Sequence, residues 1–221
     1  MLPIISIVGR SESGKTILLE GLIGELKRRG YRLATVKHSV PDFDLDQPGK
    51  DSWRLAEAGS EIVVLSSPHK LAFMKQVDSE ASLEELSQLI GEDLDLILTE
   101  GFRGGSAPKI EVHRKKLGGL LCSPEELFAV VTDEPLDINV PQYSPEEVET
   151  LADIIEKKVS ALHQVDEILL FINGTQIPLN PFVKDIISKS LLGMVSALRG
   201  AEEVRRLRIY LRRGQVDFRR C

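Results

Sequence analysis

The chain has 221 residues, of which 42% are hydrophobic, and a formal net charge of −6 at pH 7, so it is long enough for one large α/β domain and a small second unit. No run approaches the ~18 uninterrupted apolar residues of a membrane span, and the first residues lead into a strand rather than a signal peptide. Its two cysteines are far apart, which argues against a disulfide framework or a zinc knuckle. We therefore expect a cytoplasmic protein with no membrane partner.

The first predicted elements are an apolar strand over residues 4–8, a loop over 9–16 and an amphipathic helix over 18–26. The loop has the complete pattern G-x-x-x-x-G-K-[ST], in which backbone N–H groups surround a phosphate, the lysine reaches the β- and γ-oxygens and the threonine hydroxyl ligates magnesium. The expected phosphate-binding residues are Gly9, Ser11, Glu12, Ser13, Gly14, Lys15 and Thr16. We therefore expect the chain to bind a nucleoside triphosphate with Mg²⁺, with Lys15 stabilising phosphoryl charge.

Strands and helices then alternate along the chain. The predicted elements are strands at 33–36, 61–65, 71–74, 94–99, 110–114 and 128–132, and helices at 52–58, 83–90 and 145–162. Such alternation predicts an α/β fold of the P-loop NTPase type, with a doubly wound, mainly parallel sheet and ligands at the carboxyl ends of its strands. A hairpin over 61–75 would make the sheet mixed.

The C-terminal part differs in charge and in pattern. Residues 1–161 carry 18 basic and 28 acidic side chains, whereas residues 162–221 carry 10 and 6. We therefore divide the chain into a nucleotide-binding domain, 1–162, and a small basic α+β extension, 163–221. In the extension we expect a hairpin turning at Asn173-Gly174, a helix over 182–198 and a last strand over 204–211. Its basic face could meet an anionic or acidic partner or simply be solvated, and a nucleic-acid partner is not expected.

The strand at 94–99 is followed by Glu100-Gly101, where a P-loop protein places its metal-site acid and a glycine near the γ-phosphate. Asp95 is a rival, but it lies at the start of the strand, ~16 Å from the edge that holds the loop. We expect Glu100 to act at the metal and in catalysis. A solvated carboxylate is the alternative.

The segment 37–52 leaves the sheet beside the phosphate loop and is typical of a switch or substrate loop. Lys37 could neutralise a phosphate, and Asp51 could bind magnesium or cap the following helix. The remaining acids, Asp42, Asp44 and Asp46, could take part or could solvate a turn. His38 is less suited to a metal because no second histidine lies at ligand spacing.

Together these blocks closely resemble the molybdopterin-guanine dinucleotide biosynthesis protein B (MobB) family. The resemblance covers residues 2–160 and is carried by the phosphate loop, T-V-K-H at 35–38, D-L-D-Q-P-G-K-D-S at 44–52 and D-L-I-L-T-E-G-F-R at 95–103. It implies a dimeric GTP-binding protein with weak hydrolysis that assists the guanylyltransferase attaching GMP to molybdopterin. The roles it implies are phosphate binding at Gly14, Lys15 and Thr16, a metal-side role for Asp51 and Glu100, and a molybdopterin-facing or switch role for Lys37, His38 and Lys50.

The guanine-reading motif N-K-x-D of many GTPases is absent from the sequence, so the guanine preference rests on the resemblance. Asp133, at the end of the strand over 128–132, could accept hydrogen bonds from guanine N1–H and the 2-amino group. It could equally be a turn acid.

Two other functions fit the same residues. In a small-molecule kinase, Asp42, Asp44 or Asp46 would orient an acceptor hydroxyl and Arg103 could close over the triphosphate. A nucleotide-gated binding module would bind tightly without useful turnover.

Overall fold

The computed structural model describes residues 2–38, 46–91, 94–163, 168, 170–172, 175–198, 207 and 209. The chain divides into two compact units, Met1–Val165 and Asp166–Cys221. Among the residues described, no helix has the length and apolar character that a membrane crossing requires.

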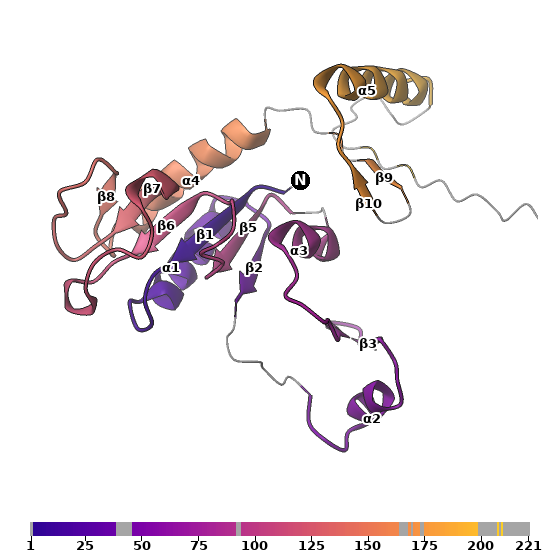
Figure 1. Cartoon of the computed structure of the whole chain (residues 1–221), viewed down its shortest axis with the longest axis horizontal. Helices are drawn as coiled ribbons and strands as arrows, with labels where there is room; N and C mark the ends of the chain where they lie inside the picture. Colours follow the sequence, from indigo (N-terminus) through magenta and orange to yellow (C-terminus); the bar gives the residue numbers. More distant parts are fainter. Residues whose placement is uncertain are drawn as a thin grey trace, which may run out of the picture. The chain divides into compact units, whose positions relative to one another are not determined.

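The first unit is built on a six-stranded sheet in the order β2-β5-β1-β6-β7-β8 (Figure 1). The strands are β1 (Ile4–Val8), β2 (Leu33–Lys37), β5 (Leu96–Glu100), β6 (Lys109–Val112), β7 (Leu127–Val131) and β8 (Gln142–Tyr143). All five neighbouring pairs are parallel, so the carboxyl ends of the strands share one edge. The predicted doubly wound α/β fold is confirmed.

Helices cover both faces of this sheet because β1, at its centre, is apolar on both sides. Ile5 and Ile7 face a core closed by α1 (Lys15–Arg28) and α4 (Val148–His163). Ile4 faces the opposite core, to which α3 (Leu83–Ile90) contributes Leu83. A Cβ on Gly21 of α1 would lie 3.2 Å from the Val148 side chain, so a glycine there lets the two helices pack closely.

An ion-pair network joins the C-terminal end of α1 to α4. Arg29 donates to Glu25, Asp153 and Glu156, each at 2.6 Å. Hydrogen bonds from Arg28 and Arg29 lower the pKa of Glu25 to about 2. The network therefore fixes the helix that starts at the phosphate loop against its neighbour.

The segment between β2 and β5 corrects two expectations. Strands β3 (Ile62–Ser66) and β4 (Leu71–Lys75) pair antiparallel in a sheet of their own, so they do not make the main sheet mixed. Helix α2 (Asp51–Glu57) has Lys50 as its N-cap and no side-chain capping bond. Asp51 is therefore the first helical residue and not the cap.

Two short 3-10 helices, η1 (Lys115–Leu117) and η2 (Pro124–Glu126), lie between β6 and β7. The second unit contains an antiparallel pair, β9 (Leu170–Ile172) with β10 (Thr175–Ile177), and α5 (Pro181–Val195). Asn180 caps α5 by accepting a hydrogen bond from Val183 N at 2.9 Å. The Asn173-Gly174 turn and most of the strand expected over 204–211 lie outside the described residues.

The chain leaves β1 at Gly9, which lies directly against β6. Gly9 has φ +146°, and a Cβ there would be 2.5 Å from the Val112 carbonyl oxygen. A side chain would push the loop off the strand, so only glycine fits this position.

We expect Gly9→Ala to destabilise the fold by about 1–3 kcal/mol because it combines a backbone clash with an unfavourable φ. Gly24→Ala is the matched control: Gly24 lies in α1 with no atom within 4 Å of its Cβ position. It should gain about 0.5–1 kcal/mol from helix propensity. Urea unfolding midpoints measure both, and two variants of equal stability would contradict the packing described for Gly9.

Candidate nucleotide-binding site

The loop between β1 and α1 has the backbone geometry of an anion cradle. Gly14, the N-cap of α1, is left-handed with φ 98°, and no side chain caps the first turn. Glu12 also has positive φ, at 61°, and Ser13 N donates to Arg10 O at 3.3 Å. The first N–H groups of α1 lack intrahelical partners, so they suit a phosphate.

Lys15 lies across the mouth of this loop. Its Nζ donates to the carbonyl oxygens of Gly9 at 3.0 Å and Arg10 at 2.7 Å. The structure therefore brings Gly9, Ser13, Gly14 and Lys15 together, as the motif predicts. Ser11 is exposed, whereas the Ser13 hydroxyl is buried and has no hydrogen-bond partner among the described residues.

Glu100, at the end of β5, is joined to the loop through Thr16. Its Oε2 accepts a hydrogen bond from Thr16 Oγ1 at 3.0 Å, and its Oε1 lies 3.2 Å from Lys37 Nζ. A hydroxyl and a carboxylate side by side are hard oxygen donors that fit Mg²⁺, which usually completes its shell with phosphate oxygens and water. The described residues contain no group of three His, Cys, Asp or Glu able to hold a metal by themselves.

Gly101 and His38 pack together at the same edge of the sheet. Gly101 has φ +98°, and a Cβ there would lie 2.9 Å from His38 Cβ. The His38 ring lies 5.2 Å from the Phe102 ring, and its Nε2 is 2.8 Å from Glu80 Oε1. His38 is therefore beside the site, with its imidazole directed to Glu80.

Other predicted residues are not joined to this group by the contacts described. Asp51 is 97% exposed, and its carboxylate lies 3.7 Å from Arg54; neither it nor Lys50 contacts Thr16 or Glu100 in the described part of the chain. Asp46 accepts a hydrogen bond from Ser52 at 3.0 Å.

Three further acids were weighed for a role at the site. Asp42 and Asp44 lie outside the described residues. Asp95 accepts a hydrogen bond from Arg32 N at 2.6 Å, at the opposite edge of the sheet from the loop, so it holds neighbouring strands together. Glu100 is the strand acid that lies at the phosphate loop.

Asp133 follows β7 at the same edge as the loop. It is exposed, and its Oδ1 accepts a hydrogen bond from Lys115 N at 2.9 Å. This backbone bond lowers the pKa of the Asp133 carboxyl group, with a further contribution from the Arg114 charge. Asp133 is therefore held in a turn by a backbone hydrogen bond, as the second expectation has it, and its part in guanine recognition stays a prediction.

A buried polar row along β6 was not predicted from the sequence. Lys109 and Glu111 alternate on the strand, His113 follows its last residue at the same spacing, and all three are buried. Lys109 donates a hydrogen bond to the Gly105 carbonyl oxygen at 2.7 Å. Glu111 accepts hydrogen bonds from Leu121 N at 2.6 Å and Cys122 N at 2.9 Å, and His113 Nε2 lies 3.1 Å from Glu134 Oε1. The available signal was the alternation of polar residues at 109, 111 and 113 in and next to the strand predicted over 110–114. These side chains hold the loops around the site.

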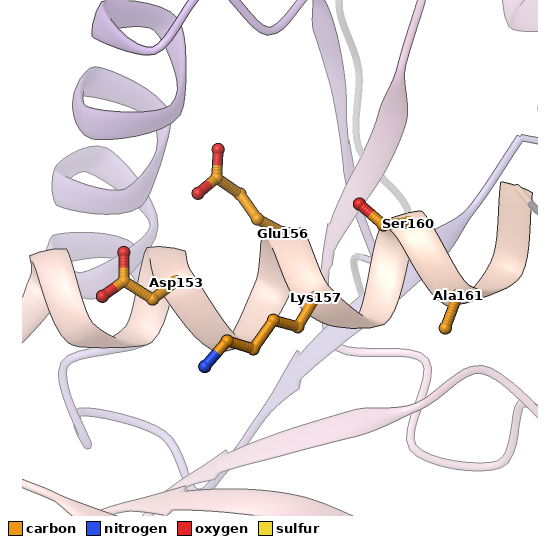
Figure 2. A pocket seen from close by; sticks show the side chains of 5 residues that line it. All are labelled: Asp153, Glu156, Lys157, Ser160 and Ala161. Carbon is orange, nitrogen blue, oxygen red and sulfur yellow. The ribbon is translucent and has the colours of Figure 1, made fainter.

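A shallow pocket elsewhere is not part of this site. Figure 2 shows that it is lined by side chains of α4 alone: Asp153, Glu156, Lys157, Ser160 and Ala161. Its acids Asp153 and Glu156 pair with Arg29, one residue beyond the far end of α1. The 14 residues of α1 separate Arg29 from the phosphate loop by ~20 Å.

The family model for molybdopterin guanine dinucleotide synthesis protein B matches residues 4–133. The molybdopterin-guanine dinucleotide biosynthesis adapter protein of Haemophilus influenzae is 39% identical over 164 residues, which are 73% of this chain and 92% of that protein.

A solved structure of molybdopterin-guanine biosynthesis protein B superposes with a TM-score of 0.54 at 33% identity, covering 70% of this chain and 99% of that one. A relative from Methanocaldococcus jannaschii is 25% identical over 233 residues, covering 93% of this chain and 96% of that protein. That alignment includes residues of the second unit, so the extension is not peculiar to this chain. The chain belongs to the molybdopterin-guanine dinucleotide synthesis protein B (MobB) family.

Proposed function

We propose that this chain is a GTP-binding adapter of molybdopterin guanine dinucleotide biosynthesis that assists guanylyl transfer to molybdopterin. The observation that carries the proposal is the hydrogen bond from Thr16 to Glu100 at 3.0 Å beside a glycine-lined phosphate loop. This pairing sets a magnesium-suited oxygen pair next to an anion cradle. Family membership supplies the pathway.

The residues of the loop fit GTP with Mg²⁺. Lys15, now bound to two loop carbonyls, would exchange them for phosphate oxygens, which are stronger acceptors because they are charged. Thr16 and Glu100 would hold the cation directly or through water. When bound, Mg²⁺ supplies charge neutralisation at the terminal phosphates. Lys37 Nζ lies 3.2 Å from Glu100 Oε1 and can shift toward the same phosphates.

Hydrolysis should be weak. Both carboxylate oxygens of Glu100 are engaged by Thr16 and Lys37, which leaves it poorly suited to activate water. Positioning and charge stabilisation by Lys15 then supply most of the rate.

Two partners belong to the proposal. The molybdenum cofactor guanylyltransferase would bind the nucleotide-loaded form of this chain, and molybdopterin or its dinucleotide would face Lys37, His38 and Lys50.

A homodimer is supported by the β3–β4 hairpin, whose apolar side chains are exposed and would be buried in an interface. They include Ile62, Val64, Leu65, Leu71 and Phe73, with exposed fractions of 42–69%.

We expect Lys15→Ala to weaken binding of Mg²⁺·GTP by about 10- to 100-fold, because charge-assisted hydrogen bonds to phosphate are lost. Calorimetric titration with GTP, GDP and ATP measures this, and circular dichroism checks folding. Lys27→Ala, an exposed lysine of the same helix, is the control and should bind as the wild type does. A folded Lys15→Ala variant with unchanged affinity would refute the site, and a wild-type preference for ATP would favour the small-molecule kinase.

Asp133→Asn tests the guanine assignment. Asparagine keeps an oxygen for Lys115 N but loses the charge that accepts from guanine N1–H and the 2-amino group. We expect the variant to lose about 10-fold or more in GTP affinity and most of the preference for GTP over ITP, which lacks the 2-amino group. Asp137→Asn, an exposed acid beyond β7, is the control. An unchanged ratio of GTP to ITP affinity in Asp133→Asn would remove Asp133 from base recognition.

A further inference from the structure

Arg114 is a cation at the site for which neither the motif nor the proposed function has a role. It lies two residues past the end of β6, and its Nε donates to the Ser13 carbonyl oxygen at 2.9 Å. A Cβ on Gly14 would lie 3.2 Å from Arg114 Nη2. The guanidinium therefore lies on the Ser13–Gly14 peptide of the phosphate loop.

The geometry of a trans peptide tells which side of the loop this is. The C=O of Ser13 and the N–H of Gly14 belong to one planar unit and point in opposite directions. Because the Gly14 N–H belongs to the set that surrounds the phosphate, the Ser13 carbonyl and Arg114 are on the outer flank. Arg114 is therefore suited to a part of the ligand that extends beyond the phosphate cradle.

The sheet order shows where that part must go. Thr16 and Glu100 hold the metal side of the site at the end of β5, on one side of β1. A nucleotide whose terminal phosphates lie there directs its nucleoside to the opposite side, over the ends of β6 and β7. These ends carry Arg114 and Asp133, and the bond from Lys115 N to Asp133 at 2.9 Å links them.

The loop that carries Arg114 is held at both ends. Glu111, 1% exposed, accepts from Leu121 N and Cys122 N. His113, also buried, pairs with Glu134 at 3.1 Å. Since Nε is fixed by Ser13, the flat guanidinium is placed before any ligand arrives, which lowers the entropy cost of binding.

We propose that Arg114 is the nucleoside-binding residue of this site, with its planar guanidinium stacked on the face of a purine base whose edge meets Asp133. Arginine stacks on aromatic faces, whereas the lysine ammonium is a point charge. The inference rests on the proposed nucleotide site. Arg114 supplies affinity for the base, and Asp133 the choice between bases.

The test is Arg114→Lys and Arg114→Ala, titrated with GTP, ITP and inorganic tripolyphosphate in magnesium. A lysine can still donate to the Ser13 carbonyl but cannot also cover a base. We expect Arg114→Lys to lose about 3- to 30-fold in affinity for GTP and ITP alike, with tripolyphosphate affinity unchanged. Lys116→Ala, an exposed cation of the same loop, is the control for charge alone and should retain GTP affinity.

Three results would overturn the inference. Equal losses for tripolyphosphate and GTP in Arg114→Lys would mean that Arg114 only braces the loop. Unchanged GTP affinity in both Arg114 variants, with binding still dependent on Lys15, would remove Arg114 while leaving the proposed function intact. A wild-type chain that binds tripolyphosphate but neither nucleotide would overturn both.

Discussion

The contact between Gly9 and the Val112 carbonyl oxygen determines where the site is built. A Cβ on residue 9 would lie 2.5 Å from this oxygen. The loop can therefore lie this close to β6 only because its first residue is glycine. The close approach brings the outer flank of the loop within reach of Arg114. On the other side of β1, the parallel register sets Ile7 opposite Glu100, which places the carboxylate at Thr16. One glycine and one strand register thus arrange the groups around the loop.

Three cations near the loop are each held by protein oxygens. Lys15 binds two carbonyls, Lys37 binds Glu100 and Arg114 binds Ser13. These partners compensate part of the desolvation cost of the cations, and they orient the side chains before an anion is bound. An incoming triphosphate has to replace the two carbonyl oxygens that Lys15 now binds. Arg114 can keep its hydrogen bond to Ser13 while the flat face of its guanidinium contacts a base. The two cations therefore differ in what they can discriminate.

The sequence predicts the central features because they depend on local patterns. The apolar strand before the phosphate loop, the helix behind it and the acid after β5 each have a short-range signal, and the parallel α/β fold follows from their alternation. The β3–β4 pair was recognised, but its separation from the main sheet depends on tertiary contacts that no local pattern shows. Capping of the following helix was one of the two roles predicted for Asp51, whereas Lys50 holds the cap position.

What the sequence could not show are contacts between distant residues. Arg114 and Ser13 are 101 positions apart. In the sequence, Lys109, Glu111 and His113 look like an ordinary polar alternation, and only the structure shows their partners in three loops. Ion pairs such as Lys37 with Glu100 likewise depend on which strands are neighbours. Local patterns thus specify the phosphate end of the site, while its outer flank follows from the order of strands.

A crystal structure of the chain with a non-hydrolysable GTP analogue and Mg²⁺ would show directly where the nucleotide lies. We expect the triphosphate in the loop that ends at Thr16, the cation at the Thr16 hydroxyl with Glu100 beside it, and the base over the ends of β6 and β7. A triphosphate bound elsewhere, or a base directed toward β5 and β2, would contradict this expectation.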